Sequence, residues 1–241
     1  MKKTFRVFII IAGICLLLAC GDKPQKQDNK QGKRDEASKV RSTEANAHYN
    51  KGKVHREQGN EDNAIASWEK AVKINPNHVR AHYSLGVAYN RQGDLRRAIA
   101  SWERVVEVNP NHPKARYNLG LAYKNQGDRD KAIASWNKVI EINPNHQKAY
   151  NNLGSAYISQ GELEKAIEAL SKATDLAPDY ARAHYNLARV YSLKHQKETA
   201  IASLQKAITL DKKVLDRIKT HKDFRNIRES PEFEQLFSSV E

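Results

Sequence analysis

Histidine and serine are the residues of this chain whose types and spacing could support chemistry. Histidine serves as a metal ligand or general base, and serine as a nucleophile. Both recur with a constant 34-residue period, as His78, His112 and His146 and as Ser67, Ser101 and Ser135. A constant long interval places such side chains in separate copies of a repeated unit and not around one ion or substrate. No P-loop, G-x-S-x-G, H-E-x-x-H or paired-carboxylate motif is present, so the sequence predicts no enzyme, no metal site and no cofactor.

Cysteine occurs only at Cys15 and Cys20. The absence of thiols after residue 20 excludes a disulfide framework, a cysteine-ligated zinc site and a cysteine nucleophile in the rest of the chain. Ahead of Cys20, a basic start is followed by an unbroken apolar run of 13 residues, from Val7 to Ala19. A helix of that length spans roughly 20 Å, which is shorter than the ~30 Å hydrocarbon core of a bilayer. The segment is therefore typical of a signal peptide and not of a transmembrane helix.

The end of the apolar run, Leu17-Leu18-Ala19-Cys20, resembles a bacterial lipobox. In lipoproteins of this kind the signal peptide is cut before the cysteine, which then carries acyl chains that anchor the protein stably to a membrane. The resemblance implies a signal peptide over residues 1–19 and lipidation at Cys20. It also implies a lipid-anchored place in the cell envelope, where Gly21 favours the outer membrane facing the periplasm over the inner membrane. The alternative is an ordinary secretory peptide in which Cys20 has no role.

Residues 20–44 are rich in Lys, Gln, Asp and Asn. After the cysteine they contain no aromatic residue and one large aliphatic residue, Val40. Such a segment buries too little apolar surface to offset the entropy lost on ordering. We expect it to form a disordered tether with a reach of roughly 25–30 Å.

The following part of the chain repeats with a 34-residue period. Tryptophans have this spacing at Trp68, Trp102 and Trp136, and so do the Asn-Pro-Asn-His segments at 75–78, 109–112 and 143–146. The pattern resembles the tetratricopeptide repeat (TPR) family, which has the same 34-residue period. The resemblance covers five repeats, at 45–78, 79–112, 113–146, 147–180 and 181–214. It implies an all-α fold, a right-handed solenoid of helix-turn-helix units.

Each repeat is predicted to contain two short helices. In the second repeat, Gly93 ends the first helix and Asp94 can cap the second. The small Gly86 lets the two helices approach, and Trp102 fills the space beside them. Four residues are predicted to cap the first helices of the following repeats: Asn77, Asn111, Asn145 and Asp179. Because one unit cannot cover its own apolar faces, the units must stack.

Beyond the fifth repeat the apolar residues lose the 34-residue period. They continue through Ile218, Phe224 and Ile227, and Ser230-Pro231 has the pattern of a helix cap followed by a first helical residue. We expect residues 215–241 to form a helical cap that covers the last repeat.

The resemblance further implies which first-helix positions face a ligand. In the family, positions 2, 5, 6 and 9 of the first helix line the concave wall. The predicted peptide-binding residues form columns of amides, phenols and cations: Asn50, Arg80, Tyr83, Lys114, Tyr117, Asn118, Lys148, Asn152, Arg182, Tyr185 and Asn186. An amide can pair with a peptide backbone, and the cations favour acidic groups. This arrangement is similar to the asparagine ladder of O-linked GlcNAc transferases, without their catalytic domain. The alternative is that the Asn and Tyr residues only brace neighbouring helices.

The net charge of +13 suggests nucleic-acid binding. No block of five like charges occurs, and an export signal places the chain away from nucleic acid, so this hypothesis is disfavoured. The leading hypothesis is a non-catalytic, membrane-anchored adaptor that binds a protein or extended peptide, preferably acidic, and touches the membrane only through its lipid. The alternative is a pilotin-like or envelope-biogenesis lipoprotein that assists assembly of a membrane complex.

Overall fold

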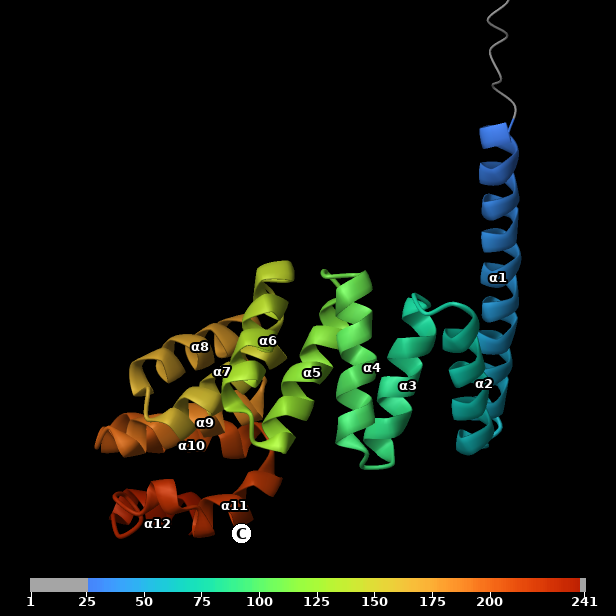
Figure 1. The fold of residues 1–241 in the computed structure, drawn as a ribbon. Helices are drawn as coiled ribbons and strands as arrows, with labels where there is room; N and C mark the ends of the chain where they lie inside the picture. Colours follow the sequence, from blue (N-terminus) through green and yellow to red (C-terminus); the bar gives the residue numbers. More distant parts are fainter. Residues whose placement is uncertain (1–25, 239–241) are drawn as a thin grey trace, which may run out of the picture.

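The computed structural model describes residues 26–238, and all regular secondary structure in this range is helical (Figure 1). Helices pair in chain order: α1 (Lys26–Glu57) with α2 (Glu61–Ile74), α3 (Val79–Arg91) with α4 (Leu95–Val108), α5 (Pro113–Gln126) with α6 (Arg129–Ile142), α7 (Gln147–Gln160) with α8 (Leu163–Leu176), and α9 (Ala181–Leu193) with α10 (Lys197–Leu210). Consecutive pairs stack side by side into an elongated solenoid (Figure 1). The predicted all-α solenoid is confirmed.

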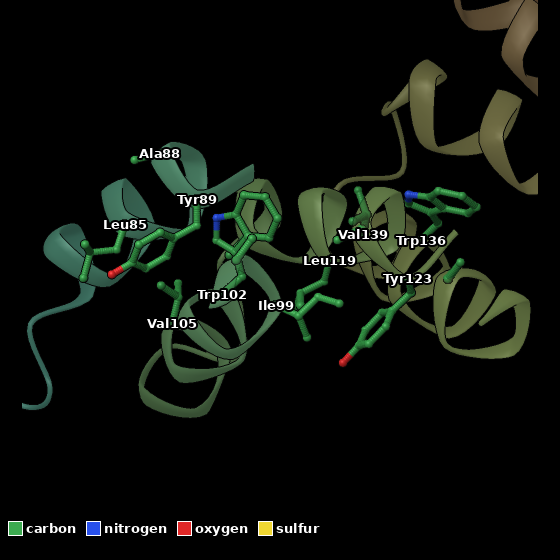
Figure 2. Close-up of a cluster of buried hydrophobic side chains, with 14 of the residues drawn as sticks. Leu85, Ala88, Tyr89, Ile99, Trp102, Val105, Leu119, Tyr123, Trp136 and Val139 are labelled. Atoms are coloured by element: carbon green, nitrogen blue, oxygen red, sulfur yellow. The ribbon is translucent and has the colours of Figure 1, made fainter. Parts of the chain in front are cut away.

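Glycine on the first helix and tryptophan on the second allow close packing within the first three pairs. A Cβ atom at Gly86 would lie 2.7 Å from Trp102 Cδ1, and one at Gly120 would lie 2.6 Å from Trp136 Cδ1. Both indoles are almost completely buried (Figure 2). The Trp136 Nε1–H also donates a hydrogen bond to the Tyr117 carbonyl oxygen, at 3.3 Å. The helices therefore meet at a distance that only a residue without a side chain permits.

Histidine, and not asparagine, caps the first helices of the second, third and fourth repeats. The Nδ1 atoms of His78, His112 and His146 each accept a hydrogen bond from the backbone N–H three residues later, at 3.1 Å. The prediction of caps at Asn77, Asn111, Asn145 and Asp179 is wrong, because each residue lies one position too early, and α9, which follows Tyr180, has no side-chain cap. The backbone N–H groups of the three asparagines instead donate to the asparagine two residues before, as Asn77 does to Asn75 Oδ1 at 3.0 Å. The Asp94 cap is confirmed, since its carboxylate accepts from the Arg97 N–H at 2.9 Å.

The histidine caps predict a loss of stability in mild acid. Burial lowers the pKa of His78, His112 and His146, and the cation two residues later in each case lowers it further. A protonated Nδ1 cannot accept the capping hydrogen bond, so protons bind preferentially to the unfolded chain, in which the histidine pKa is about 6.5. Stability should be complete above about pH 7 and should fall as the pH drops through 6.5 towards the lower folded pKa.

Thermal unfolding at pH 7.5 and pH 5.5 measures this effect. Asparagine caps helices without titrating, so the triple variant H78N/H112N/H146N should lose less stability between the two pH values than the unaltered protein. The dependence of stability on pH should not vanish in the triple variant, because burial also lowers the pKa of His82 and His221. If the triple variant lost as much stability between pH 7.5 and pH 5.5 as the unaltered protein, the histidine caps would not be the titrating groups.

The N-terminal part of α1 corrects the tether prediction. Residues 26–44 are helical, so a disordered tether over 20–44 is wrong for that part, while residues 20–25 lie outside the described range. Residues 34–44 are exposed, and the first buried residue after them is Ala45. The segment lacks a core, as its composition predicts, but its Lys, Arg, Gln, Glu and Ala residues favour helix, and extending an existing helix avoids the nucleation cost. No helix in residues 26–238 is long and apolar enough to span a membrane.

The C-terminal segment covers the fifth pair. Two short 3₁₀ turns, η1 (Lys212–Val214) and η2 (Lys222–Phe224), flank α11 (Leu215–Thr220), and α12 (Pro231–Ser238) follows. Its apolar side chains pack on α9 and α10 and are almost fully buried: Ile218, Phe224, Ile227, Phe233 and Leu236. Ser230 Oγ accepts a hydrogen bond from the Phe233 N–H at 3.3 Å, which confirms the cap and helix start predicted at Ser230-Pro231.

Candidate peptide-binding groove

The cation column is exposed. Arg80, Lys114, Lys148 and Arg182 each lie in the first turn of the first helix of their repeat, and all four side chains are open to solvent. The ion pairs formed within residues 26–238 use other basic residues. These four charges are therefore available to a ligand.

The amide column is tied to the phenol column of the preceding repeat. Asn118 Nδ2 donates to Tyr83 Oη at 3.4 Å, and Asn152 Nδ2 donates to Tyr117 Oη at 3.2 Å. The bracing alternative thus accounts for the amide N–H groups. The half-buried Asn118 and Asn152 still carry a carbonyl oxygen, which can accept a hydrogen bond from a peptide N–H.

The phenol column is held by the histidine caps. The rings of Tyr83 and His112 lie 5.2 Å apart between centroids, and those of Tyr117 and His146 lie 5.0 Å apart. Each half-buried tyrosine thus contacts the histidine cap and the asparagine of the next repeat. The recurrent histidines do not form a common site, since each caps a different helix. The same side chains thus link successive repeats along the wall of the groove.

Two predicted wall residues at the C-terminal end are covered. Tyr185 is only 1% exposed and packs against His221 and Phe224 of the cap. Asn186 is 5% exposed, and both ends of its amide are engaged because it donates to Asn151 Oδ1 at 2.9 Å and accepts from Arg189 at 3.0 Å. The prediction that these two side chains face an open groove is therefore wrong. At the opposite end, Asn50 is exposed.

Next to the covered residues lies a pocket of about 200 Å³, which we call the basic pocket. Its cations are Lys124 from α5, Arg182 and Arg189 from α9 and Arg217 from α11, and its floor contains Asn151 and Asn186. The sequence prediction included Arg182 and two of the amides that line the pocket, Asn152 and Asn186, but none of the other three cations. The position-9 rule of the repeat pattern would have found Arg189, whereas Arg217 belongs to the cap, where no repeat period exists.

Profiles of the TPR repeat match residues 52–93, 88–127 and 154–194, and profiles of the tetratricopeptide repeat match 113–146, 135–168 and 181–214. Together they run without a gap from residue 52 to residue 214. The chain belongs to the tetratricopeptide repeat family. No curated protein is similar enough in sequence to count as a match.

Solved TPR structures resemble this TPR protein over its repeat region. A crystal structure of MamA is 31% identical, with a TM-score of 0.64, and the match covers 68% of this chain and 96% of MamA. MamA from Desulfovibrio magneticus RS-1 is 27% identical, with a TM-score of 0.65, and the match covers 70% of this chain and 96% of that one. YrrB, described as a TPR protein with an unusual peptide-binding site, is 22% identical, with a TM-score of 0.64 and coverage of 70% and 87%. At that identity YrrB supports the fold alone.

Proposed function

We propose that this TPR protein is a non-catalytic adaptor that binds an extended, acidic segment of a partner protein along its first-helix columns. The observation that carries the proposal is the row of exposed cations at Arg80, Lys114 and Lys148, which form no ion pair within residues 26–238 and lie beside the amide column. Membership in a family of interaction scaffolds supports a protein partner. The peptide-binding site named for YrrB gives a precedent on the same fold.

The spacing of the columns sets the form of the ligand. Adjacent helices pack about 8–10 Å apart, and an extended peptide rises about 3.3 Å per residue. One column therefore meets every third peptide residue. Acidic residues at that interval would face the cations, and backbone N–H groups would face the free carbonyl oxygens of Asn118 and Asn152.

A designed peptide tests the proposal. The probe is a fluorescein-labelled peptide with Glu at every third position and Ser elsewhere, and its affinity is measured by fluorescence anisotropy. The variant R80E/K114E/K148E should bind this peptide at least about tenfold more weakly, because three attractions become repulsions. Added salt should weaken binding to the unaltered protein in the same direction.

A matched variant separates the columns from net charge. Lys73, Arg96 and Lys206 are exposed on the second helices of their repeats, so K73E/R96E/K206E has the same total charge as the groove variant. It should retain most of the affinity. Equal losses in the two triple variants, or equal binding of a peptide with Lys in place of Glu, would contradict the groove.

We also propose that the adaptor is anchored to a membrane through Cys20. The anchor rests on the lipobox resemblance, and Cys20 lies outside the described residues. Helix α1 begins at Lys26, and its part up to Glu44 would rise about 28 Å at 1.5 Å per residue. In an anchored protein this segment would act as a spacer that holds the repeats away from the bilayer.

The anchor predicts the fate of a C20S variant. Serine cannot form the thioether to the lipid, so C20S should leave the membrane fraction and lose metabolic labelling with palmitate. C15S is the matched control, because it also removes a thiol from the N-terminal segment, and it should remain labelled. Membrane-bound and labelled C20S would contradict the anchor and leave the groove proposal untouched.

A further inference from the structure

The basic pocket carries an excess of positive charge. Four cations line it, and the one carboxylate that pairs with any of them within residues 26–238 is Asp223, at 2.8 Å from Arg189. Lys124, Arg182 and Arg217 remain without an acidic partner in that part of the chain. Burial lowers the pKa of Lys124, and the charges of Arg182 and Arg189, which line the same pocket, lower it further.

The positions of two of these charges, Arg189 and Arg217, are constrained by the surrounding structure. The floor amides Asn151 and Asn186 are 1% and 5% exposed and hydrogen-bond to each other. Arg189 is fixed between Asn186 and Asp223 by bonds of 3.0 and 2.8 Å. The Arg217 guanidinium lies 4.9 Å from the centre of the Tyr185 ring. Charges that are held before a ligand arrives lose less entropy on binding than free side chains do.

The charge and size of the pocket indicate the class of ligand. A carboxylate would offset one of the three excess positive charges. A phosphate group carries close to two negative charges near neutral pH and would offset more of the excess. Guanidinium forks match the several oxygens of a phosphate. A volume of about 200 Å³ accommodates such a group with water but no helix.

We infer that the basic pocket binds a phosphate dianion, either free or carried as a monoester. The C-terminal cap completes the site through Arg217, so the cap has a binding role beyond covering the last repeat. This inference goes beyond the adaptor proposal and does not depend on it. The pocket shares none of the three cations altered in the groove test.

Calorimetric titration of the full chain with inorganic phosphate at pH 7.5 tests the inference, with acetate at the same ionic strength as the monoanion. Phosphate should give saturable binding and acetate should not. K124Q and R217A should each weaken phosphate binding by about tenfold or more, because each removes one charge-assisted contact. R225A is the matched control, since Arg225 is exposed on the same cap outside the pocket, and it should bind as the unaltered protein does.

Two further comparisons interpret the result. Lys124 lies on α5, outside the cap, so K124Q tests the site even if R217A loosens the cap. A phosphoserine peptide that binds more tightly than inorganic phosphate would identify a phosphorylated partner as the source, and the reverse order would identify a small free phosphate. Absence of saturable phosphate binding, equal binding of acetate, or unchanged affinity in both K124Q and R217A would overturn the inference.

Discussion

Replacing Gly120 with alanine should lower the free energy of unfolding by about 3 kcal/mol, the upper part of the range for overpacking a core. The added Cβ would lie 2.6 Å from Cδ1 and from Cε2 of Trp136. The indole has no room to move, because Trp136 is fully buried in the core (Figure 2). Its Nε1–H also donates a hydrogen bond to the Tyr117 carbonyl oxygen. Urea denaturation followed by circular dichroism measures the loss.

The fifth repeat supplies a rescue for this substitution. There the equivalent pair is Ala188 and Leu204, and both side chains are fully buried in one cluster. W136L alone should be destabilised by the cavity that it leaves. The double variant G120A/W136L reproduces the pair of the fifth repeat. Its loss in the free energy of unfolding should therefore be smaller than the sum of the two single losses by about 2 kcal/mol.

A second glycine provides the control. Gly32 lies on the exposed part of α1, and a Cβ there would meet no atom within 4 Å. G32A should cause no loss, because alanine favours an exposed helix over glycine by about 0.5–1 kcal/mol. Similar losses in G32A and G120A, or strictly additive losses in the double variant, would contradict the packing argument.

Replacing Phe224 with alanine should cost about 3–5 kcal/mol and detach the cap from α9. Phe224 is fully buried, its ring centroid lies 5.7 Å from that of Tyr185, and it also contacts Phe233. Its neighbour Asp223 forms the ion pair to Arg189. A truncated Phe224 should therefore release both the apolar contact and the ion pair that join the cap to the last repeat.

Limited proteolysis and denaturation together report this loss. F224A should be cut within residues 211–238 much faster than the unaltered protein, while the earlier repeats stay resistant. F237A is the control: Phe237 is half-buried at the end of α12, and its loss should cost no more than about 1.5 kcal/mol. Protease resistance of F224A equal to that of F237A would show that Phe224 does not hold the cap.

The repeats were predictable because the contacts that form each helical pair join residues that are close in the sequence. The 34-residue period, turn residues at a constant position, and the pairing of Gly86 with Trp102 are all visible in the sequence and define both helices of a unit. The exposure of Arg80 and Lys114 was predictable as well, because both occupy the same position of the 34-residue repeat. The tether was misjudged because low apolar content excludes a core but does not exclude an exposed helix that extends a packed one.

The direction of the side-chain contacts could not be predicted from the repeat pattern. Histidine rather than asparagine caps the first helices because the loop places the histidine, and not the asparagine one residue before it, next to the free N–H group. In the second repeat His78 Nδ1 accepts from the Ala81 N–H. The Asn118 amide can pair with a ligand or with Tyr83, and the distance between successive helices selects Tyr83.

By itself the sequence determined the helical units, their number and their order of stacking, because each depends on residues within a 34-residue interval. Only the tertiary structure decided where the groove ends and what lies there. The cap has no period, so the burial of Tyr185 and the approach of Arg217 to Lys124, which are far apart in the chain, arise from packing between distant segments. Contacts at that separation leave no pattern in a single sequence.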